Sequence, residues 1–434
     1  MKHFLAVMLY VLSVLPDMRR LLPLIIYLIL SSNICIAQWV HQQSGVSTQE
    51  FRNVEFLNEN TGFVCGWNTI LKTTNGGINW INKIIPFSYT QYDISIIDSN
   101  IIYCAGNYGR ILKSTNGGEN WISLYSDTLA YPRACHFINE NTGWIAGTRG
   151  FPNYSFLVKT TDGGATFNSQ AFANIAISDI YFKDANTGLI VADKIYKTTN
   201  GGTNWYETNY NSNGVGYIFN KFGIADDQYC WLISYSRVVY KSKDFGENWD
   251  SITTVPAGTM SVNTTFFIDE NTGWAGIDFG RIFKTSDGGY NWFECSTPQP
   301  SGFISDIFFL NETTGWAVEG NNGNIFKTTN GGCNTINIVQ NNNYVPDRNE
   351  LLQNYPNPFN PETKINYNLI KQGKVQIKVF DIRGKYVETI ISSDLSQGNY
   401  TAIFNGLNLP SGVYFYSLTL DNKLISTKKM LLIK

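Results

Sequence analysis

Four basic residues stand at related positions of a repeated stretch, where they could bind an anionic group. Arg110, Lys194 and Arg281 each precede a recurring Lys by three residues, and Arg237 lies one place away from that position. In a closed ring of repeats, equivalent positions surround one axis, and cations gathered there would bind a carboxylate or an anionic sugar. The alternative interpretation is four solvated turn residues.

Aromatic residues lie in the longer connections beside these cations. The stretches SLYSDTLAYPRACHF and TRGFPNYSF contain Tyr125, Tyr131 and Tyr154, with Phe151 beside the last. Their rings could stack on sugars in a binding site. Loop aromatics exposed singly, without a role, are the alternative.

Candidates for catalysis are sparse. After the processing predicted below, only His41 and His136 remain and no CxxC spacing occurs, so we expect no metal, no cofactor and no Ser/His/Asp triad. Asp226, Asp227 and Asp278 lie on connections that suit a glycosidase pair of carboxylates, without further context. A non-catalytic binding protein is therefore the leading hypothesis, and an extracellular glycoside hydrolase acting on polysaccharide is the alternative.

The elements that would position these residues come from seven copies of one phrase. Copies such as KTTNGGINW begin at residues 72, 113, 159, 197, 241, 284 and 327, so their spacing runs from 38 to 46. A second phrase, such as FLNENTGF at 56, precedes five of them. Each unit reads as four short strands joined by turns, which predicts an all-β fold with a seven-bladed β-propeller over residues 38–340.

The first phrase predicts a turn that fastens the blades. The Asn or Asp side chain can accept backbone N–H groups two residues on, the preceding Thr or Ser hydroxyl adds a weaker bond, and Gly77 supplies a positive φ. Trp80 would fill the space between two blades. The Asn and Asp residues given this structural role are Asn75, Asn116, Asp162, Asn200, Asp244, Asp287 and Asn330.

These residues, in the pattern S/T-x-D/N-x-G-x-x-W, resemble the Asp-box (BNR) repeat of sialidase-like proteins. With the TGW and GxIxKT phrases, residues 45–340 more closely resemble the photosystem II assembly and stability factor family of seven-bladed propellers. That resemblance implies a structural role for the boxes. The arginine phrase of sialidases, Arg-Ile-Pro, is missing. An assembly-factor-like role is a third hypothesis, although the tail described below directs the chain away from any thylakoid.

The seventh copy departs from the pattern, because Cys333-Asn334-Thr335 lacks the Trp. The stretch Gln38-Trp39-Val40 resembles the strand that follows the turn. Propellers often close by mixing strands from both chain ends. We therefore predict that Trp39 supplies the missing ring of the last blade.

The last 81 residues form a second predicted domain, a small Ig-like β-sandwich at 354–434 that follows a linker at 341–353. The phrase NYPNPFNP from Asn354, the phrases VFD and SGVYFY, and the terminal KKMLLIK closely resemble the C-terminal sorting domain of the type IX secretion system. The resemblance implies export from a Bacteroidetes-like bacterium, with the outer-membrane secretion machinery as a partner. We expect a secreted or cell-surface protein.

The N-terminus and the charge complete the picture. Residues 1–37 have the basic, apolar and small-residue parts of a signal peptide, and Met18 is a second candidate start. A membrane-spanning helix is the alternative, but the apolar run is short for one. Residues 38–340 carry a net charge of −8, which argues against nucleic acid. We expect a monomer that binds a glycan or a surface protein.

Overall fold

The computed structural model describes residues 39–434 apart from 47–49, 87, 151–153, 171, 173–174, 211–218, 296, 299–301, 334–338, 343–345, 396 and 407–408. The predicted signal peptide lies outside the described residues. Within them, the chain forms no helix of the length and apolarity needed to span a membrane.

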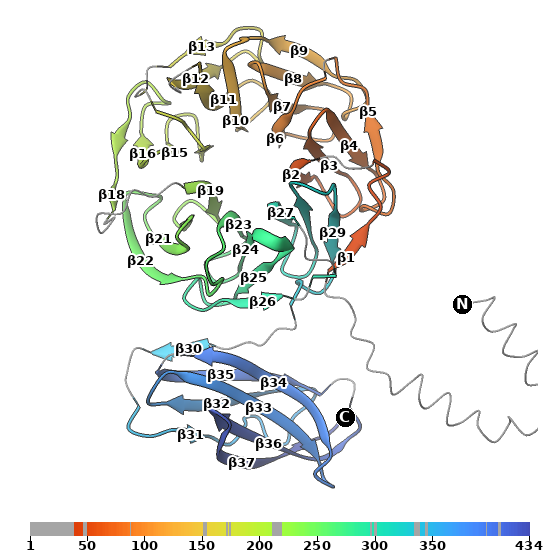
Figure 1. Ribbon diagram of the computed structural model, residues 1–434, viewed down its shortest axis with the longest axis vertical. Helices are drawn as coiled ribbons and strands as arrows, with labels where there is room; N and C mark the ends of the chain where they lie inside the picture. The colour runs from red at the N-terminus through yellow and green to blue at the C-terminus, as the bar shows by residue number, and fades with distance from the viewer. Residues whose placement is uncertain are drawn as a thin grey trace, which may run out of the picture. The chain divides into compact units, whose positions relative to one another are not determined.

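Seven sheets are arranged around a central channel and form the predicted propeller (Figure 1). Blade one contains β2 (Phe51–Phe56), β3 (Gly62–Gly66), β4 (Thr69–Thr73) and β5 (Ile81–Lys83); blade two contains β6 (Gln91–Ile96), β7 (Ile102–Gly106), β8 (Arg110–Ser114) and β9 (Ile122–Tyr125); blade three contains β10 (Ala130–Phe137), β11 (Gly143–Arg149), β12 (Tyr154–Thr160) and β13 (Asn168–Ser169). Blade four contains β14 (Asp179–Phe182), β15 (Gly188–Val191), β16 (Ile195–Thr198) and β17 (Tyr206–Glu207); blade five contains β19 (Phe219–Ile224), β20 (Cys230–Ser234), β21 (Val238–Ser242) and β22 (Asn248–Thr254), with β18 (Asn209–Tyr210) parallel to β22. Blade six contains β23 (Val262–Phe267), β24 (Gly273–Ile277), β25 (Ile282–Thr285) and β26 (Phe293–Cys295); blade seven contains β27 (Ile304–Phe309), β28 (Gly315–Glu319), β29 (Ile325–Thr328) and β1 (Val40–Gln42).

The propeller has two faces, which the antiparallel strands define. The first strand of each blade lines the channel, and the chain reverses after it at the turn of the second phrase (Figure 1). This turn and the KTTNGG turn share one face, which we call the clasp face. The turns between second and third strands share the opposite face with the blade connections, and we call it the mouth face.

The turns of the clasp face are held by their own side chains. Thr73 Oγ1 accepts the N–H of Gly77 at 2.9 Å, and Asn75 Oδ1 accepts the N–H of Asn79 at 2.9 Å. Five further copies repeat both bonds. In these copies the Asn or Asp side chain accepts an N–H group four residues on rather than the predicted two, because two successive glycines such as Gly76 and Gly77 have positive φ and tighten the turn.

Neighbouring blades are joined mainly by the aromatic residue of the second phrase. Trp316 of blade seven stacks on Phe56 of blade one with ring centroids 3.5 Å apart, and four other blade pairs repeat this stack. Trp316 Nε1 and Lys327 Nζ also donate to the carbonyl of Gly76, at 3.3 and 2.8 Å. Blade seven is thus bonded to the clasp turn of blade one.

The ring is closed by the N-terminal strand, as predicted. β1 pairs antiparallel with β29, so it is the fourth strand of blade seven. Trp39 is fully buried and meets Phe309 edge-on at 5.7 Å, as Trp80 meets Phe56 at 5.9 Å. Trp39 therefore replaces the ring that the seventh copy lacks.

One disulfide joins the last two blades. Cys295, the last residue of β26, is bonded to Cys333 in the seventh clasp turn, 38 residues on. Cys65, Cys104, Cys135 and Cys230 are free and buried, as expected of small core residues. The sequence pattern alone did not indicate the Cys295–Cys333 pair.

The C-terminal part forms two four-stranded sheets with a shared core. One contains β31 (Glu350–Leu351), β32 (Glu362–Leu369), β35 (Gly398–Asn405) and β30 (Val339–Asn342); the other contains β34 (Tyr386–Leu395), β33 (Gly373–Asp381), β36 (Gly412–Leu420) and β37 (Lys423–Leu432). β30 and β31 overlap the predicted linker, so strand pairing of the sandwich begins before residue 354.

Candidate binding site

A repeated irregularity in the first strands of five blades turns a side chain toward the channel. The pairing of β2 with β3 slips at Arg52, and the same slip recurs at Tyr92, Arg133, Asn263 and Ser305. Such β-bulges re-aim a side chain and are frequent beside functional sites. The bulged residue stands at the mouth, and the next residue lies one level deeper.

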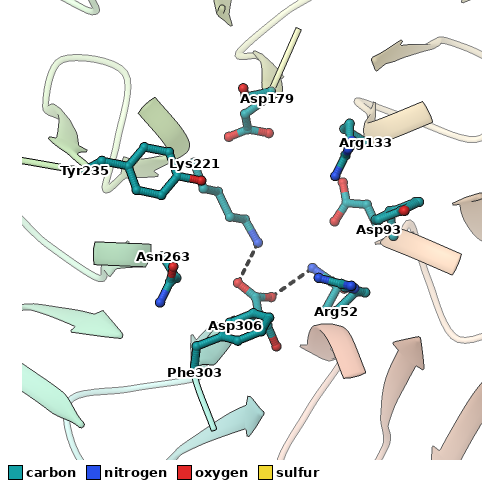
Figure 2. Close-up of a pocket in the computed structure, with 13 residues that line it drawn as sticks. Arg52, Asp93, Arg133, Asp179, Lys221, Tyr235, Asn263, Phe303 and Asp306 are labelled. Atoms are coloured by element: carbon teal, nitrogen blue, oxygen red, sulfur yellow. Dashed lines mark hydrogen bonds and ion pairs between the residues drawn. The ribbon is translucent and has the colours of Figure 1, made fainter. Parts of the chain in front are cut away.

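A pocket of about 220 Å³ occupies the mouth of the channel, and all seven blades line it (Figure 2). Its outer level, which we call the rim, holds Arg52, Tyr92, Arg133, Ser178, Tyr235, Asn263, Phe303 and Ser305. Its floor is a ring of Asn53, Asp93, Asp179, Lys221 and Asp306. Below this floor the channel continues as a second chamber of about 280 Å³, which includes Glu55 and His136.

Asp306 is the structural centre of the floor. One carboxylate oxygen accepts Nδ2 of Asn53 at 2.8 Å and the backbone N–H of Val54 at 3.1 Å. The other accepts Nζ of Lys221 at 2.8 Å and the hydroxyl of Thr264 at 3.1 Å. Figure 2 shows Lys221 reaching across the channel to it. Because four donors from three other blades surround Asp306, its side chain serves to join blades.

The other two floor aspartates also bind the next blade. Asp93 accepts the N–H of Cys135, and Asp179 accepts the N–H of Phe222, both at 2.8 Å. Burial raises the pKa of Asp93 to about 7 and that of Asp179 to about 6, although Lys221 lowers both. Burial and the charge of Asp93 raise the pKa of Glu55 to about 8. Near neutral pH the floor therefore carries less negative charge than its composition suggests.

The rim carries positive charge on an aromatic ring. The guanidinium carbons of Arg133 and Arg52 lie 4.9 and 5.7 Å from the centroid of the Tyr92 ring. Arg52 also pairs with Glu50 at 2.6 Å, while the Arg133 side chain is exposed at the mouth. Stacked guanidinium groups keep their N–H donors free to point outward. This pair of arginines can bind a planar anion such as a carboxylate.

None of the seven binding residues predicted from sequence lines this pocket. Lys194 pairs with Glu207 at 2.7 Å, and Arg281 makes two bonds to Glu294 at 2.5 and 2.6 Å, so both are engaged with the fourth strand of their own blades. Arg110 begins β8, and Arg237 lies in an exposed turn with positive φ. All four lie on the mouth face but farther out than the first strands, so they do not form a ring around the channel.

The predicted aromatic residues also lie on the mouth face. Tyr131 and Tyr154 are exposed, whereas Tyr125 packs edge-on against Phe167 at 5.4 Å. A binding role for these seven residues stays a prediction.

Two suggested catalytic carboxylates are on the wrong face. Asp226 and Asp227 lie in the turn between β19 and β20, on the clasp face, where Asp226 accepts the N–H groups of Gln228 and Tyr229. Asp278 lies on the mouth face and accepts Nδ2 of Asn263 at 3.0 Å. Among the described residues no cluster of His, Cys, Asp and Glu is suited to a metal ion.

The pocket residues were missed because the sequence signal lies in the less regular phrase. The outer level falls four residues before the residue that ends each first strand, such as Phe56 or Phe137. Aligning the copies there would have found Arg52, Tyr92 and Arg133 as a set. Bulges, however, cannot be read from alternation alone, which would place neighbouring residues on opposite sides of a strand.

Comparison with known families agrees with this architecture. The family model for photosynthesis system II assembly factor YCF48 matches residues 32–131 and 171–335. The chain belongs to the YCF48 family. A second model, the secretion system C-terminal sorting domain, matches residues 353–434, and the protein is accordingly a secreted or cell-surface protein exported by the type IX system. No curated protein matches the chain in sequence.

Solved structures support the fold. A YCF48 structure bound to D1 peptide is 18% identical, covers 67% of this chain and 97% of its own, and has a TM-score of 0.57. PorZ, a bacterial surface component of the type IX secretion system of Porphyromonas gingivalis, is 13% identical over 89% of this chain and 59% of its own, with a TM-score of 0.50. A GH74 enzyme of Niastella koreensis is 13% identical over 91% and 74%, with a TM-score of 0.52.

Proposed function

We propose that this YCF48-family protein is a non-catalytic binding module that acts outside the cell and holds a polypeptide partner on its mouth face. The observation that carries the proposal is a separation of residue types between the two faces. All six arginines of residues 38–340 lie at the mouth end of a strand or in a mouth-face turn: Arg52, Arg110, Arg133, Arg149, Arg237 and Arg281.

Exposed aromatic side chains follow the same separation. Of eight exposed Trp, Tyr and Phe side chains among the described propeller residues, six lie on the mouth face: Trp67, Tyr89, Tyr131, Tyr154, Tyr235 and Phe279. Arginine and aromatic residues are the types enriched in protein interfaces and in their energetic hot spots. The composition of this face thus favours a protein partner over a solvated surface.

Several of these side chains are held in place before any partner binds. Arg149 pairs with Asp127 at 2.8 Å, and Phe279 is 57% exposed at a backbone φ of 58°. A non-glycine residue in the left-handed region is energetically costly, and such strain is found where function requires it. Pre-ordering reduces the entropy lost on binding.

The mouth pocket would be the central anchor of this face. Its volume fits one or two side chains, and its Arg52–Tyr92–Arg133 rim would bind an acidic one. The solved YCF48 structure with D1 peptide gives support from a relative, at the level of the fold. A glycan is the other ligand class that the sequence suggested, and it becomes an outcome of the test.

The test uses the whole mature chain, residues 38–434, against a displayed library of linear peptides and an array of neutral and acidic glycans. We expect peptides enriched in Asp and Glu. Binding should fall at least about tenfold in Arg133→Ala and in Tyr92→Ala, as expected for hot-spot residues. The control Lys243→Ala removes an exposed cation from the clasp face and should bind normally. Glycan binding without peptide binding, or an unaffected Arg133→Ala variant, would refute the proposal.

A glycoside hydrolase remains the second candidate, because Asp93 and Asp179 both line the pocket with raised pKa values. A raised pKa suits a general acid. However, each carboxylate accepts a backbone N–H of the next blade, which is a structural use. Release of reducing ends from acidic polysaccharides, abolished by Asp93→Asn with the fold intact, would favour the enzyme.

A further inference from the structure

The sorting domain exposes an apolar groove that has no part in the proposed binding at the mouth face of the propeller. In the sheet of β34, β33, β36 and β37, inward side chains such as Val375, Ile377 and Val379 are buried in the sandwich core. By the alternation of a strand, the other face should be polar, as Lys374, Gln376 and Lys378 are. Phe380 breaks this pattern on the outward face.

Other apolar residues on the same outward face lie near Phe380 and form a continuous apolar surface with it. Phe415 is the register partner of Phe380 on β36, Ile382 directly follows β33, and Leu424 lies on β37. With Gly384, Ser417 and Thr427 they line a groove of about 530 Å³. Ile382 is 68% exposed and Leu424 is 59% exposed.

The turn that carries Ile382 is built to present it. Asp381 Oδ1 accepts the N–H groups of Arg383 and Lys385 at 2.8 and 2.9 Å, and Gly384 donates to the Asp381 carbonyl at 2.9 Å. Gly384 has a φ of +77°, where other residues are strained. A well-bonded turn that points an Ile into water indicates that something covers it.

The border of the groove is basic. Arg383 lies beside Ile382, Lys429 is the register partner of Phe415, and Lys378 is the register partner of Ser417; the side chain of Arg383 is 79% exposed. Residues 354–434 hold ten Lys or Arg and five Asp or Glu, so the domain is positive while the propeller segment is negative. The complementary surface is therefore an apolar ridge bordered by carboxylates.

We propose that this groove is where the sorting domain docks on an outer-membrane protein of the secretion machinery through such a ridge. The family match identifies the partner as a secretion system, and it spans every residue of the groove. The propeller ligand and the secretion partner thus bind separate surfaces, so either proposal can fail alone.

The experiment follows export of the full chain, with an epitope tag inserted between residues 37 and 38, in a bacterium with a type IX system. Ile382→Asp should lower the extracellular or surface fraction at least about tenfold, as expected when one apolar anchor of roughly 1.4 kcal/mol or more is lost. The protein should accumulate, folded, in the periplasm. Because the Ile382 side chain is mostly in water, the change should leave thermal unfolding of the purified protein unaltered.

Matched variants separate docking from general surface effects. Ile370→Asp changes an Ile that is 41% exposed outside the groove and should be exported normally. Lys378→Glu with Lys429→Glu should reduce export, while Lys364→Glu, on β32 of the other sheet, should not. Normal export of both Ile382→Asp and Leu424→Asp would overturn the proposal, and so would an equal loss of export in Ile370→Asp.

Discussion

The clasp face and the mouth face of the propeller are joined by the same strands but use their residues differently. The clasp face repeats one pair of turn bonds in six of its seven copies, and its Lys and Trp side chains bond to the neighbouring blade. The mouth face changes from blade to blade and gathers the arginines and exposed aromatics. Repetition therefore marks the residues that hold the ring together, and variation marks those available to a partner.

The largest difference between the faces should appear when a Trp is removed from each. Trp316→Ala deletes a buried ring stacked on Phe56 and the bond to Gly76, which should cost about 3–5 kcal/mol of unfolding free energy. Trp67→Ala, on the mouth face, removes a ring that is 56% exposed and should cost less than about 0.5 kcal/mol. Urea denaturation measures both. Similar losses would mean that the faces do not differ in this way.

The next largest effect on stability should come from removing the disulfide that joins the last two blades. Replacing Cys295 and Cys333 together by Ser opens a 38-residue loop in the unfolded chain, and should cost about 2–4 kcal/mol. A reducing agent should lower the melting temperature of the parent protein and leave the double variant unchanged. If reduction has no effect on the parent, the disulfide adds nothing to closure by β1.

Removing a single cation from each face should produce a smaller difference in unfolding free energy. Lys327→Met removes the bond from Nζ to the Gly76 carbonyl and should cost about 1–2 kcal/mol. Arg133→Met removes a mouth-face cation that is exposed and should change the unfolding free energy by less than about 0.5 kcal/mol. Chemical denaturation of the two variants, side by side, checks the contrast. A larger loss in Arg133→Met would assign that residue to the fold.

The carboxyl group of Glu55, which lies in the channel, should make the free energy of unfolding depend on pH. Burial raises the pKa of Glu55 from its ordinary value of 4.5 to about 8, so the folded state favours the neutral form. This contribution is fully present below pH about 4.5 and is lost as the pH rises to about 8. Glu55→Gln should therefore gain stability relative to the parent between pH 5 and 8. Parallel stability profiles would contradict the assignment.

The sequence predicted the fold because the fold depends on the repeated residues. Thr73, Asn75 and Gly77 signal a turn through local chemistry, and the missing Trp of the last copy led to Trp39. The bond pattern within the turn was predicted less well, since two successive residues with positive φ let Asn75 reach four residues on.

The residues chosen from the sequence and the mouth pocket lie on the same face of the propeller but on different strands. Arg110, Lys194 and Arg281 lie at or just before the start of the third strands of their blades, whereas the pocket is lined mainly by first strands. The distance of a strand from the channel axis depends on its place in the sheet, and the sequence of one repeat does not show that distance. Lys221 and Asp306 come from different blades, 85 residues apart, and their pairing depends on ring closure. No local pattern could indicate it.

The central claim is that the mouth face, and not the clasp face, binds a polypeptide. Its most direct test is the affinity of one selected acidic peptide for residues 38–434, measured by calorimetry, with Arg133→Ala and Lys243→Ala as the matched pair. The account predicts at least about a tenfold weaker affinity for Arg133→Ala and no change for Lys243→Ala. Equal affinities in the two variants, or a loss in Lys243→Ala alone, would contradict it.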